Sequence, residues 1–245
     1  MDQDLTYKYR PLRFEDFWCQ RGIVTMMPRI IESRSLPRST ILTGIWGCGK
    51  TSLAELVGQK ASCLKVTERN PCYECLGCQF VDTRIATYGG RFKVYGGNFK
   101  FDELQRFCNN CQVYPAPDPY HIWVPIVDEV QFLDINIQQR VVNLLDSIDT
   151  ARFIFCTSDL NKVEEAIRKR SQIFEMPTPT EEEAVVATLA IAKAEGIPVT
   201  RAVAEQIAAA KTNNPRDCTN LLQLMKGTGQ TSLPQDDDRA DRLVF

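Results

Sequence analysis

The sequence has almost no net charge, no long apolar run and no leader-like N-terminus. Its 29 basic and 31 acidic residues leave a formal net charge of −2, so no overall basic field attracts nucleic acid and any DNA contact must come from a local patch. No apolar stretch approaches the ~20 residues that span a bilayer. The first residues, Met1-Asp2-Gln3-Asp4, are acidic and lack the basic and apolar regions of a signal peptide. We therefore expect a cytoplasmic protein with no membrane partner.

A glycine-rich segment, Gly44-Ile45-Trp46-Gly47-Cys48-Gly49-Lys50-Thr51, matches the phosphate-loop pattern G-x4-G-K-S/T. Glycines at these positions let backbone N–H groups approach phosphate oxygens, and the following helix adds the positive end of its dipole. Lys50 is placed to reach the β- and γ-phosphates, and the Thr51 hydroxyl to bind Mg²⁺. The segment therefore predicts a site for a nucleotide, ATP, with Mg²⁺.

Two carboxylates follow an apolar strand in Ile126-Val127-Asp128-Glu129. Asp128 can position the ligand shell of Mg²⁺, and Glu129 can polarise the water that attacks the γ-phosphate. Taken alone, the pair could also be two solvated acids at the end of a strand. The phosphate loop upstream favours the catalytic interpretation.

Four cysteines, Cys63, Cys72, Cys75 and Cys78, follow the phosphate-loop helix with the spacing C-x8-C-x2-C-x2-C. In a reducing compartment, clustered cysteines bind metal more often than they form disulfides. Four thiolates would hold Zn²⁺ tetrahedrally and leave no position for water, so the site would be structural. The spacing alone also allows an iron–sulfur cluster.

The other six cysteines have apolar or helical surroundings, and we expect most of them to be small buried side chains. They are Cys19, Cys48, Cys108, Cys111, Cys156 and Cys218. Cys108 and Cys111 form a second C-x2-C pair, but no further pair of ligands accompanies it.

Strand-like and helix-like segments alternate from residue 40 to residue 176, which is typical of an α/β protein with a parallel, doubly wound sheet, here of five strands. The expected strands cover residues 40–43, 92–95, 122–127, 152–157 and 172–176. The expected helices among them cover residues 22–33, 51–61, 102–111 and 137–148. We assign residues 1–177 to this nucleotide-binding domain, with a metal module inserted at residues 62–80.

After Thr178-Pro179-Thr180 the sequence becomes rich in alanine and loses its strand signals. Three helical stretches follow, at residues 181–195, 200–211 and 215–226. We interpret residues 178–226 as a small three-helix lid domain. Residues 227–245 are polar and acidic, and we expect them to form a flexible tail.

Taken together, the chain resembles the AAA+ ATPases and, within them, the bacterial DNA polymerase III gamma/tau clamp-loader subunits, over about residues 7–226. The segments that carry the resemblance are Lys8-Tyr9-Arg10-Pro11, Phe14-Glu15-Asp16, Gly44 to Ser52, the four cysteines, Asp128-Glu129-Val130, Phe153 to Asp159 and Pro215-Arg216-Asp217. The resemblance implies an AAA+ fold with a lid domain, and zinc as the metal of the cysteine site.

The resemblance also implies roles for single residues. The expected nucleotide-binding residues are Tyr9, Arg10, Pro11, Gly44, Gly47, Gly49, Lys50, Thr51, Ser52 and Arg216. Ser158, or its neighbour Thr157, would sense the γ-phosphate at the end of the sensor-1 strand, and Arg216 would reach that phosphate from the lid. Arg170 stands where the family places an arginine finger that acts on the nucleotide of a neighbouring subunit.

The surroundings of Arg170 leave other interpretations open. The family's Ser-Arg-Cys triplet is replaced here by Lys169-Arg170-Ser171, so Arg168 or Lys169 could supply the finger instead. The three basic residues could also be a solvated charge run.

The resemblance implies an ATP hydrolase that places a sliding clamp on primer-template DNA together with other clamp-loader subunits. An AAA+ ATPase of another DNA transaction or defence complex is the alternative. A non-hydrolysing scaffold is a third, disfavoured because Lys50, Thr51, Asp128 and Glu129 are all present. The chain ends about where the family's helical collar would begin. This, with Gln131 in place of a usual histidine and Cys19-Gln20 in place of Gly-Gln, would fit a phage-encoded version acting in the host cytoplasm.

Two further segments suggest partners. Basic and aromatic residues alternate in one stretch, which would suit DNA backbone contact but would also suit ordinary strand and core positions. They are Arg84, Tyr88, Arg91, Phe92, Lys93, Tyr95, Phe99 and Lys100. The acidic C-terminus ends in Leu243-Val244-Phe245, which resembles the end of a clamp-binding peptide, although a plain disordered tail is the simpler interpretation.

Overall fold

The computed structural model of the chain describes residues 4–65, 68–75, 78, 91–95, 101–113, 123–230 and 232. The chain divides into two compact units. The first is Pro11–Pro177, and the second combines Met1–Arg10 with Thr178–Phe245. Residues 1–10 therefore group with the C-terminal helices and not, as the sequence suggested, with the nucleotide-binding domain.

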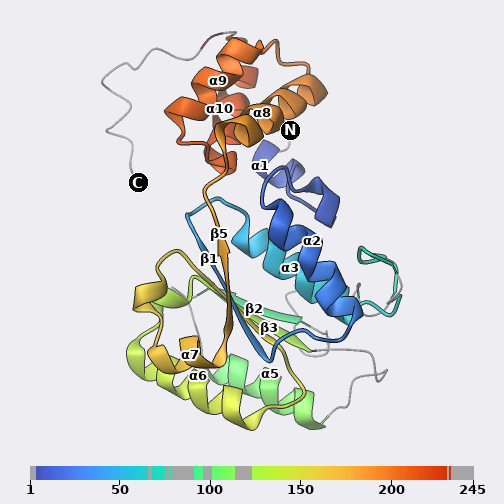
Figure 1. The fold of residues 1–245 in the computed structure, drawn as a ribbon, viewed down its shortest axis with the longest axis vertical. Helices are drawn as coiled ribbons and strands as arrows, with labels where there is room; N and C mark the ends of the chain where they lie inside the picture. The colour runs from blue at the N-terminus through green and yellow to red at the C-terminus, as the bar shows by residue number, and fades with distance from the viewer. Residues whose placement is uncertain are drawn as a thin grey trace. The chain divides into compact units, whose positions relative to one another are not determined.

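The first unit is built on one sheet of five strands in the order β2-β3-β4-β1-β5 (Figure 1). The strands are β1 (Ser39–Gly44), β2 (Arg91–Tyr95), β3 (Val124–Asp128), β4 (Phe153–Thr157) and β5 (Gln172–Met176). Every pairing between them is parallel. The strands therefore all end at the same edge, which gathers Gly44, Asp128 and Thr157 there.

Helices cover both faces of this sheet, with α2 (Arg21–Glu32) and α3 (Lys50–Ser62) on one side in Figure 1. The opposite face carries α5 (Phe101–Val113), α6 (Ile135–Ser147) and α7 (Glu165–Arg170). Successive strand residues point to opposite faces, so Ile41 joins the core under α5 and α6 while Leu42 joins the core under α2 and α3. Burial on both faces explains why the central strands β3 and β4 read as continuous apolar runs.

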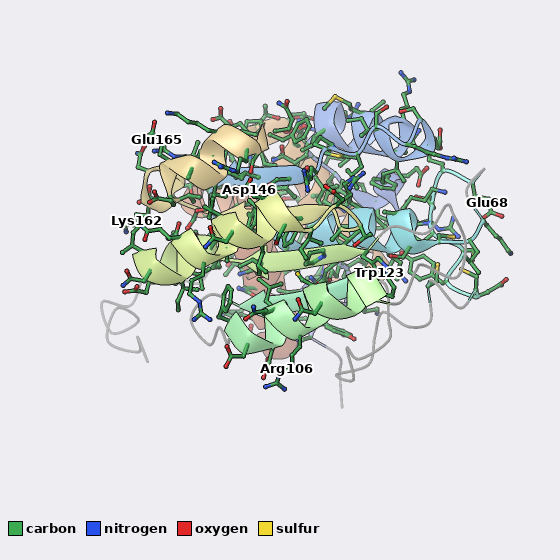
Figure 2. The ribbon with its side chains drawn as sticks, turned by 90° about the horizontal axis from the view of Figure 1, so that it is seen from below. Glu68, Arg106, Trp123, Asp146, Lys162 and Glu165 are labelled. Atoms are coloured by element: carbon green, nitrogen blue, oxygen red, sulfur yellow. The ribbon has the colours of Figure 1, made fainter. Side chains whose placement is uncertain are left out.

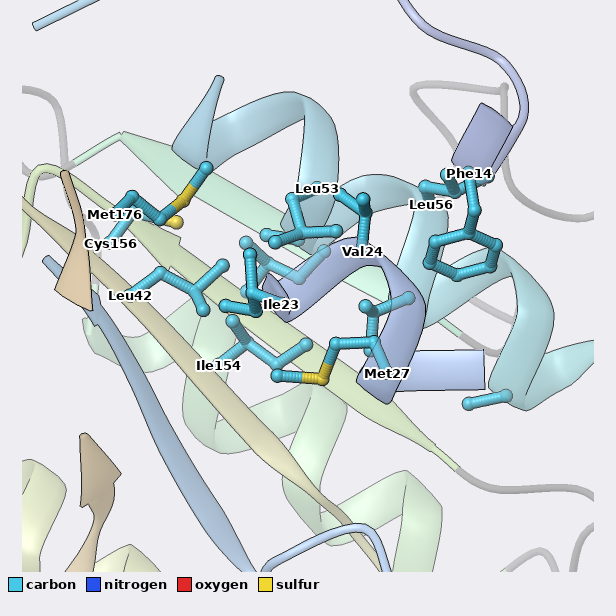
Figure 3. Close-up of a cluster of buried hydrophobic side chains, with 14 of the residues drawn as sticks. Phe14, Ile23, Val24, Met27, Leu42, Leu53, Leu56, Ile154, Cys156 and Met176 are labelled. Carbon is cyan, nitrogen blue, oxygen red and sulfur yellow. The ribbon is translucent and has the colours of Figure 1, made fainter. Parts of the chain in front are cut away.

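The core under α2 and α3 is shown in Figure 3. Leu42, Ile154 and Cys156 of the sheet lie there against side chains of the two helices. Phe14, from a single 3₁₀ turn over Phe14–Asp16, is buried in the same cluster. The N-terminal part of the first unit is thus packed onto the helix that follows the phosphate loop.

The second unit contains α1 (Leu5–Lys8), α8 (Glu181–Glu195), α9 (Arg201–Ala210) and α10 (Pro215–Thr228). The Thr180 hydroxyl accepts from the Glu183 N–H, and the Glu183 carboxylate accepts from the Thr180 N–H, which fixes the start of α8. At the start of α10 the Asn214 side chain accepts from the N–H groups of Arg216 and Asp217, and Pro215 occupies the first helical position.

The segment Leu5–Tyr9 is held in the second unit by packing and charge. Leu5 is fully buried against Ile191, Ile207 and Leu222. The buried Glu195 carboxylate accepts from Lys8 Nζ at 2.7 Å, from the Tyr9 hydroxyl and from Lys226 Nζ at 3.1 Å. The hydrogen bonds from Lys8, Tyr9 and Lys226 lower the pKa of Glu195 to about 2. These contacts explain why residues 1–10 do not belong to the sheet unit.

The expected strands and helices agree with the observed ones to within two residues at each end. The parallel α/β sheet followed by a helical part is therefore confirmed. Helices α1 and α7 were not predicted. The basic residues Arg168, Lys169 and Arg170, expected as a charge run or finger, form the last turn of α7.

Candidate functional site

The phosphate loop joins the end of β1 to the start of α3, and its glycines meet two steric demands. A Cβ atom at Gly44 would lie 2.4 Å from the carbonyl oxygen of Met176, so no larger residue fits. Gly49 has φ 99°, a left-handed conformation that favours glycine, immediately before α3 begins at Lys50. The loop backbone therefore depends on the residues that define its sequence pattern.

Lys50 and Thr51 are placed by the first turn of α3. Lys50 is 4% exposed, and its Nζ donates to the carbonyl oxygens of Gly44 and Ile45, both at 2.9 Å. The Thr51 hydroxyl donates to both carboxylate oxygens of Asp128 at 3.0 Å. A hydroxyl and a carboxylate side by side are the oxygen ligands that Mg²⁺ prefers next to a nucleotide, so this pair fits the expected ion.

Glu129 lies directly beside the sensor-1 residues. It follows β3 with φ 53° and begins a short 3₁₀ turn over Val130–Phe132. Gln131, in this turn, donates through Nε2 to the Glu129 carboxylate and, at 2.8 Å, to Ser158 Oγ. Ser158 Oγ in turn lies 3.4 Å from Glu129 Oε2. The expected water-polarising carboxylate and phosphate sensor are thus one hydrogen-bonded group.

Gln131 is the centre of this network. Its Oε1 accepts from the buried Thr157 hydroxyl at 2.7 Å, and the side chain itself is 8% exposed. The Thr157 hydroxyl also accepts from the Asp159 N–H at 3.1 Å, which orients it toward Gln131. The sequence marked Gln131 only as a departure from the family pattern and assigned it no role. The only feature of the sequence that could have indicated a role for Gln131 was its position two residues after Glu129.

Arg170 is held by a carboxylate of the same chain. Its Nε and Nη2 donate to the two oxygens of Asp146 at 2.8 and 2.9 Å, and its Nη1 donates to the Ala166 carbonyl at 3.1 Å. Asp146 lies on α6 beside α7 (Figure 2). The bond from Arg170 lowers the pKa of Asp146 below its ordinary value. Lys169 instead pairs with Glu165 at 2.7 Å, so of these two residues Arg170 alone has a bidentate partner on another helix.

The four cysteine sulfurs of Cys63, Cys72, Cys75 and Cys78 all lie within 4.8 Å of one another. Two of the separations are 3.9 Å, between Cys72 and Cys78 and between Cys63 and Cys75. Four bonds of about 2.3 Å to one tetrahedral Zn²⁺ would separate the sulfurs by about 3.8 Å. The spacing fits a single ion, because a cluster of several irons would hold the sulfurs farther apart.

Backbone N–H groups of the loop donate to the cysteine sulfurs, with different effects on their pKa values. Burial raises the pKa of Cys75, but donation from the Leu64 N–H at 3.4 Å and from other donors in the loop outweighs it, and the pKa falls to about 7. Cys63 accepts from the Cys72 N–H at 3.5 Å, although burial raises its pKa above the ordinary value. A bound cation would favour the thiolate form at all four positions.

The structure places the remaining predicted residues as follows. Tyr9, Arg10 and Arg216 belong to the second unit, where Arg216 is exposed in the first turn of α10. Pro11 begins the first unit, and Ser52 lies in the first turn of α3. Their roles toward a nucleotide stay predictions.

Several predictions fall outside the described part of the chain. The side chains of the basic and aromatic stretch at residues 84–100 and the peptide at residues 243–245 are among them. So is the side chain of Cys111, whereas Cys108 is fully buried, which raises its pKa to about 12. The described cysteines outside the metal cluster are all buried, as expected: Cys19, Cys48, Cys108, Cys156 and Cys218. Among the described helices, none is both long and apolar enough to cross a membrane.

A family model and the curated relatives both match this chain to subunits of DNA polymerase III. A family model described as DNA polymerase III, delta subunit, matches residues 19–180. The DNA polymerase III subunit gamma of Buchnera aphidicola subsp. Acyrthosiphon pisum is 24% identical, with 90% of this chain and 61% of that protein aligned. The subunit tau of Bacillus subtilis is 27% identical, with 90% of this chain and 39% of that protein aligned.

The chain therefore spans roughly two fifths to three fifths of the length of these curated relatives. Among solved structures, the RuvB Holliday junction branch migration motor of Thermotoga maritima superposes with a TM-score of 0.63 at 15% identity. That alignment covers 93% of this chain and 70% of the RuvB chain. At this identity the likeness concerns the fold alone, which is that of an AAA+ protein.

Proposed function

We propose that this chain, which belongs to the DNA polymerase III delta subunit family and carries a gamma/tau-like AAA+ domain, is an ATP-hydrolysing subunit of a sliding-clamp loader. The observation that carries the proposal is the meeting of phosphate loop, Asp128, Glu129 and Ser158 at one edge of the sheet. Asp128 accepts from the Thr51 hydroxyl, and Glu129 lies beside the Ser158 hydroxyl. Phosphoryl transfer requires such a metal-binding carboxylate and a carboxylate that orients the attacking water.

Each residue of the edge has a distinct task in hydrolysis. Lys50 would exchange its bonds to the loop carbonyls for bonds to the β- and γ-phosphates, while the loop N–H groups hold the phosphate oxygens. Thr51 and Asp128 would hold Mg²⁺, which supplies charge neutralisation between the phosphates when bound. Glu129 would accept a hydrogen bond from the attacking water and orient it toward the γ-phosphate.

The sensing and positioning residues act around this edge. Ser158 would donate to a γ-phosphate oxygen, and Gln131 would hold Ser158 and Glu129 at a fixed separation. From the family resemblance, Tyr9, Arg10, Pro11 and Arg216 would complete the nucleotide site. The four cysteines would hold one structural Zn²⁺, a role that their sulfur spacing supports.

Arg170 would act on the nucleotide of a neighbouring subunit. Its bidentate pair with Asp146 fixes the guanidinium on the exposed side of α7. The Nη1 group donates to the Ala166 carbonyl, and a phosphate oxygen could take the place of that acceptor. An arginine finger contributes about 10³-fold or more to turnover. Arg170→Ala should therefore bind ATP normally and lose hydrolysis.

A mixing experiment separates this finger from a solvated charge. Protein carrying Lys50→Ala cannot use its own nucleotide site but still offers Arg170 to a neighbour. Adding it to Arg170→Ala protein should restore part of the turnover. Unaltered turnover by Arg170→Ala alone would show that the residue is not a finger.

The clamp-loading role is tested through its partners. Tagged protein should co-purify with a sliding clamp and other loader subunits in the presence of ATP, and primed DNA with the clamp should stimulate its ATP hydrolysis. Glu129→Gln, which would trap the ATP-bound form, should increase clamp recovery. Hydrolysis that responds to DNA but never to a clamp would contradict clamp loading and support a different DNA transaction.

A further inference from the structure

The cysteine module, defined here as residues 63–78, reaches across to the N-terminal turn of the first unit. Asn70 Oδ1 accepts from the Phe14 N–H at 3.0 Å, and Asn70 Nδ2 donates to Glu15 at 2.8 Å. Arg69 Nε lies 3.1 Å from the Glu15 carboxylate, and the Tyr73 hydroxyl donates to the Leu12 carbonyl. Every one of these contacts ends on the short segment 12–15.

That segment is a rigid turn in its own right. The Asp16 carboxylate accepts from the backbone N–H groups of Leu12, at 3.1 Å, and Arg13, at 2.8 Å. Residues 12–16 therefore move together, and a contact that holds Phe14 and Glu15 holds the whole turn.

The turn is packed against the phosphate loop. Phe14 is 1% exposed and Phe17 is 8% exposed, both in one buried cluster with Cys48 of the loop and Leu56 of α3. Figure 3 shows Phe14 and Leu56 in this cluster. The Phe17 ring lies so close to Gly49 that a Cβ atom there would come within 3.2 Å of its Cε1. The position of Phe17 thus bears directly on the residue that precedes Lys50.

The described part of the module has little apolar packing of its own. Its cysteine ligands Cys72 and Cys75 are half-buried, and Leu64 and Tyr73 are exposed. A loop too short to bury a core takes its folded form from the metal that its thiolates share. The metal therefore fixes Asn70, Arg69 and Tyr73 in the places from which they reach the turn.

We propose that the cysteine module is a strut for the nucleotide site, with Asn70 as a positioning residue that holds segment 12–17 against the phosphate loop. Metal bound by the four cysteines then sets the affinity for ATP, although none of these four residues belongs to the phosphate loop. This inference rests on the proposed nucleotide binding. It assigns to the metal a task beyond folding its own loop.

The test uses Asn70→Ala in the full chain, with Glu74→Ala as the matched control. Glu74 lies in the same module but pairs with Lys65 at 3.3 Å, away from the turn. The Asn70 variant should keep one zinc per chain by elemental analysis, exchange the Phe14 amide hydrogen faster, and bind ATP about tenfold more weakly. The control should match the unmodified protein in all three measurements.

Removing the metal from the unmodified protein with a chelator should produce the same two changes, and adding zinc back should reverse them. If Asn70→Ala loses zinc, Tyr73→Phe carries the test, since it deletes only the hydroxyl that contacts Leu12. Normal ATP affinity in the zinc-containing Asn70 variant, or in the metal-free protein, would overturn the proposal.

Failure of the proposed function gives a different result. If the unmodified protein binds no ATP, the proposed nucleotide site is wrong. Amide hydrogen exchange at residues 12–17 still tests whether the cysteine module holds that segment in place. If neither removal of zinc nor Asn70→Ala changes the exchange rate at these residues, the module is not a strut, whether or not the protein binds ATP.

Discussion

The phosphate-loop edge and the cysteine centre are both sites for an ion, but they are held in opposite ways. Asp128 and Thr157 end strands β3 and β4 in the middle of the sheet, and Thr51 lies in the first turn of α3, so the fold fixes all three before any ligand binds. The cysteine sulfurs come from an irregular loop and accept hydrogen bonds from backbone N–H groups of that same loop. The first site is organised by the core, and the second depends on its metal.

The largest effect should come from the phosphate-loop edge. Lys50→Ala removes the only lysine of the loop, and losing a buried charge contact of about 3 kcal/mol weakens ATP binding about 100-fold or more. Calorimetric titration with ATP and Mg²⁺ measures this. Lys162→Ala, an exposed lysine on the same unit, is the control and should bind normally. Affinity within a few-fold of the unmodified protein would remove Lys50 from the site.

The cysteine centre should fail differently. Cys75→Ser/Cys78→Ser protein should lose its one zinc per chain, while the main thermal unfolding of the sheet changes little because no strand carries a ligand. Cys108→Ala, outside the cluster, should keep the zinc. If the double variant retains zinc, the assigned ligands are wrong. If it no longer folds, the sheet unit itself depends on the metal.

A smaller effect should come from Gln131, which lies at the phosphate-loop edge beside Glu129. Gln131→Ala removes bonds to Glu129, Ser158 and Thr157, and a loss of about 1.4 kcal/mol in the transition state lowers turnover about tenfold. ATP affinity should change little, because Gln131 has no proposed contact with the phosphates. Gln131→His, which introduces the histidine that the family resemblance implies at this position, should keep part of the turnover that Gln131→Ala loses. A change in affinity with unchanged turnover would contradict this positioning role.

The smallest effect should be a loss of stability of the second unit at low pH. Hydrogen bonds from Lys8, Tyr9 and Lys226 lower the pKa of Glu195 from 4.5 to about 2. Because the folded pKa is depressed, the stabilisation is complete above about pH 4.5 and is lost as the pH falls toward about pH 2. Thermal unfolding between about pH 6 and about pH 3 should show this loss, and Glu195→Gln should lessen it. An identical pH dependence in both proteins would exclude the cluster as its cause.

The same comparison explains what the sequence could reveal. The phosphate loop, Asp128, Glu129 and the four cysteines are local patterns, and each lies where its pattern predicts. The partners of these residues are not local: Asp146 is 24 residues from Arg170, and Asn70 is 56 residues from Phe14. Such contacts depend on how helices and turns pack, which no spacing records.

The N-terminal segment shows the same limit. Tyr9 and Arg10 form part of a motif that resembles the family, so the sequence placed them with the nucleotide-binding domain. Buried Leu5 and the contacts of Glu195 with Lys8 and Tyr9 join them to the helical unit instead. Helix α7 was missed because its six residues, Glu165–Arg170, are dominated by charge and are too few to show a helical period.

Single-turnover hydrolysis by Glu129→Gln tests most directly whether the sheet edge holds one hydrolysing ATP site. With Glu129 replaced, the loop, Lys50 and Thr51 remain, so one ATP per chain should still bind. Without the carboxylate that orients the attacking water, phosphate release should fall about 100-fold or more. Hydrolysis at the unmodified rate by Glu129→Gln, or no hydrolysis by the unmodified protein with its partners, would contradict such a site.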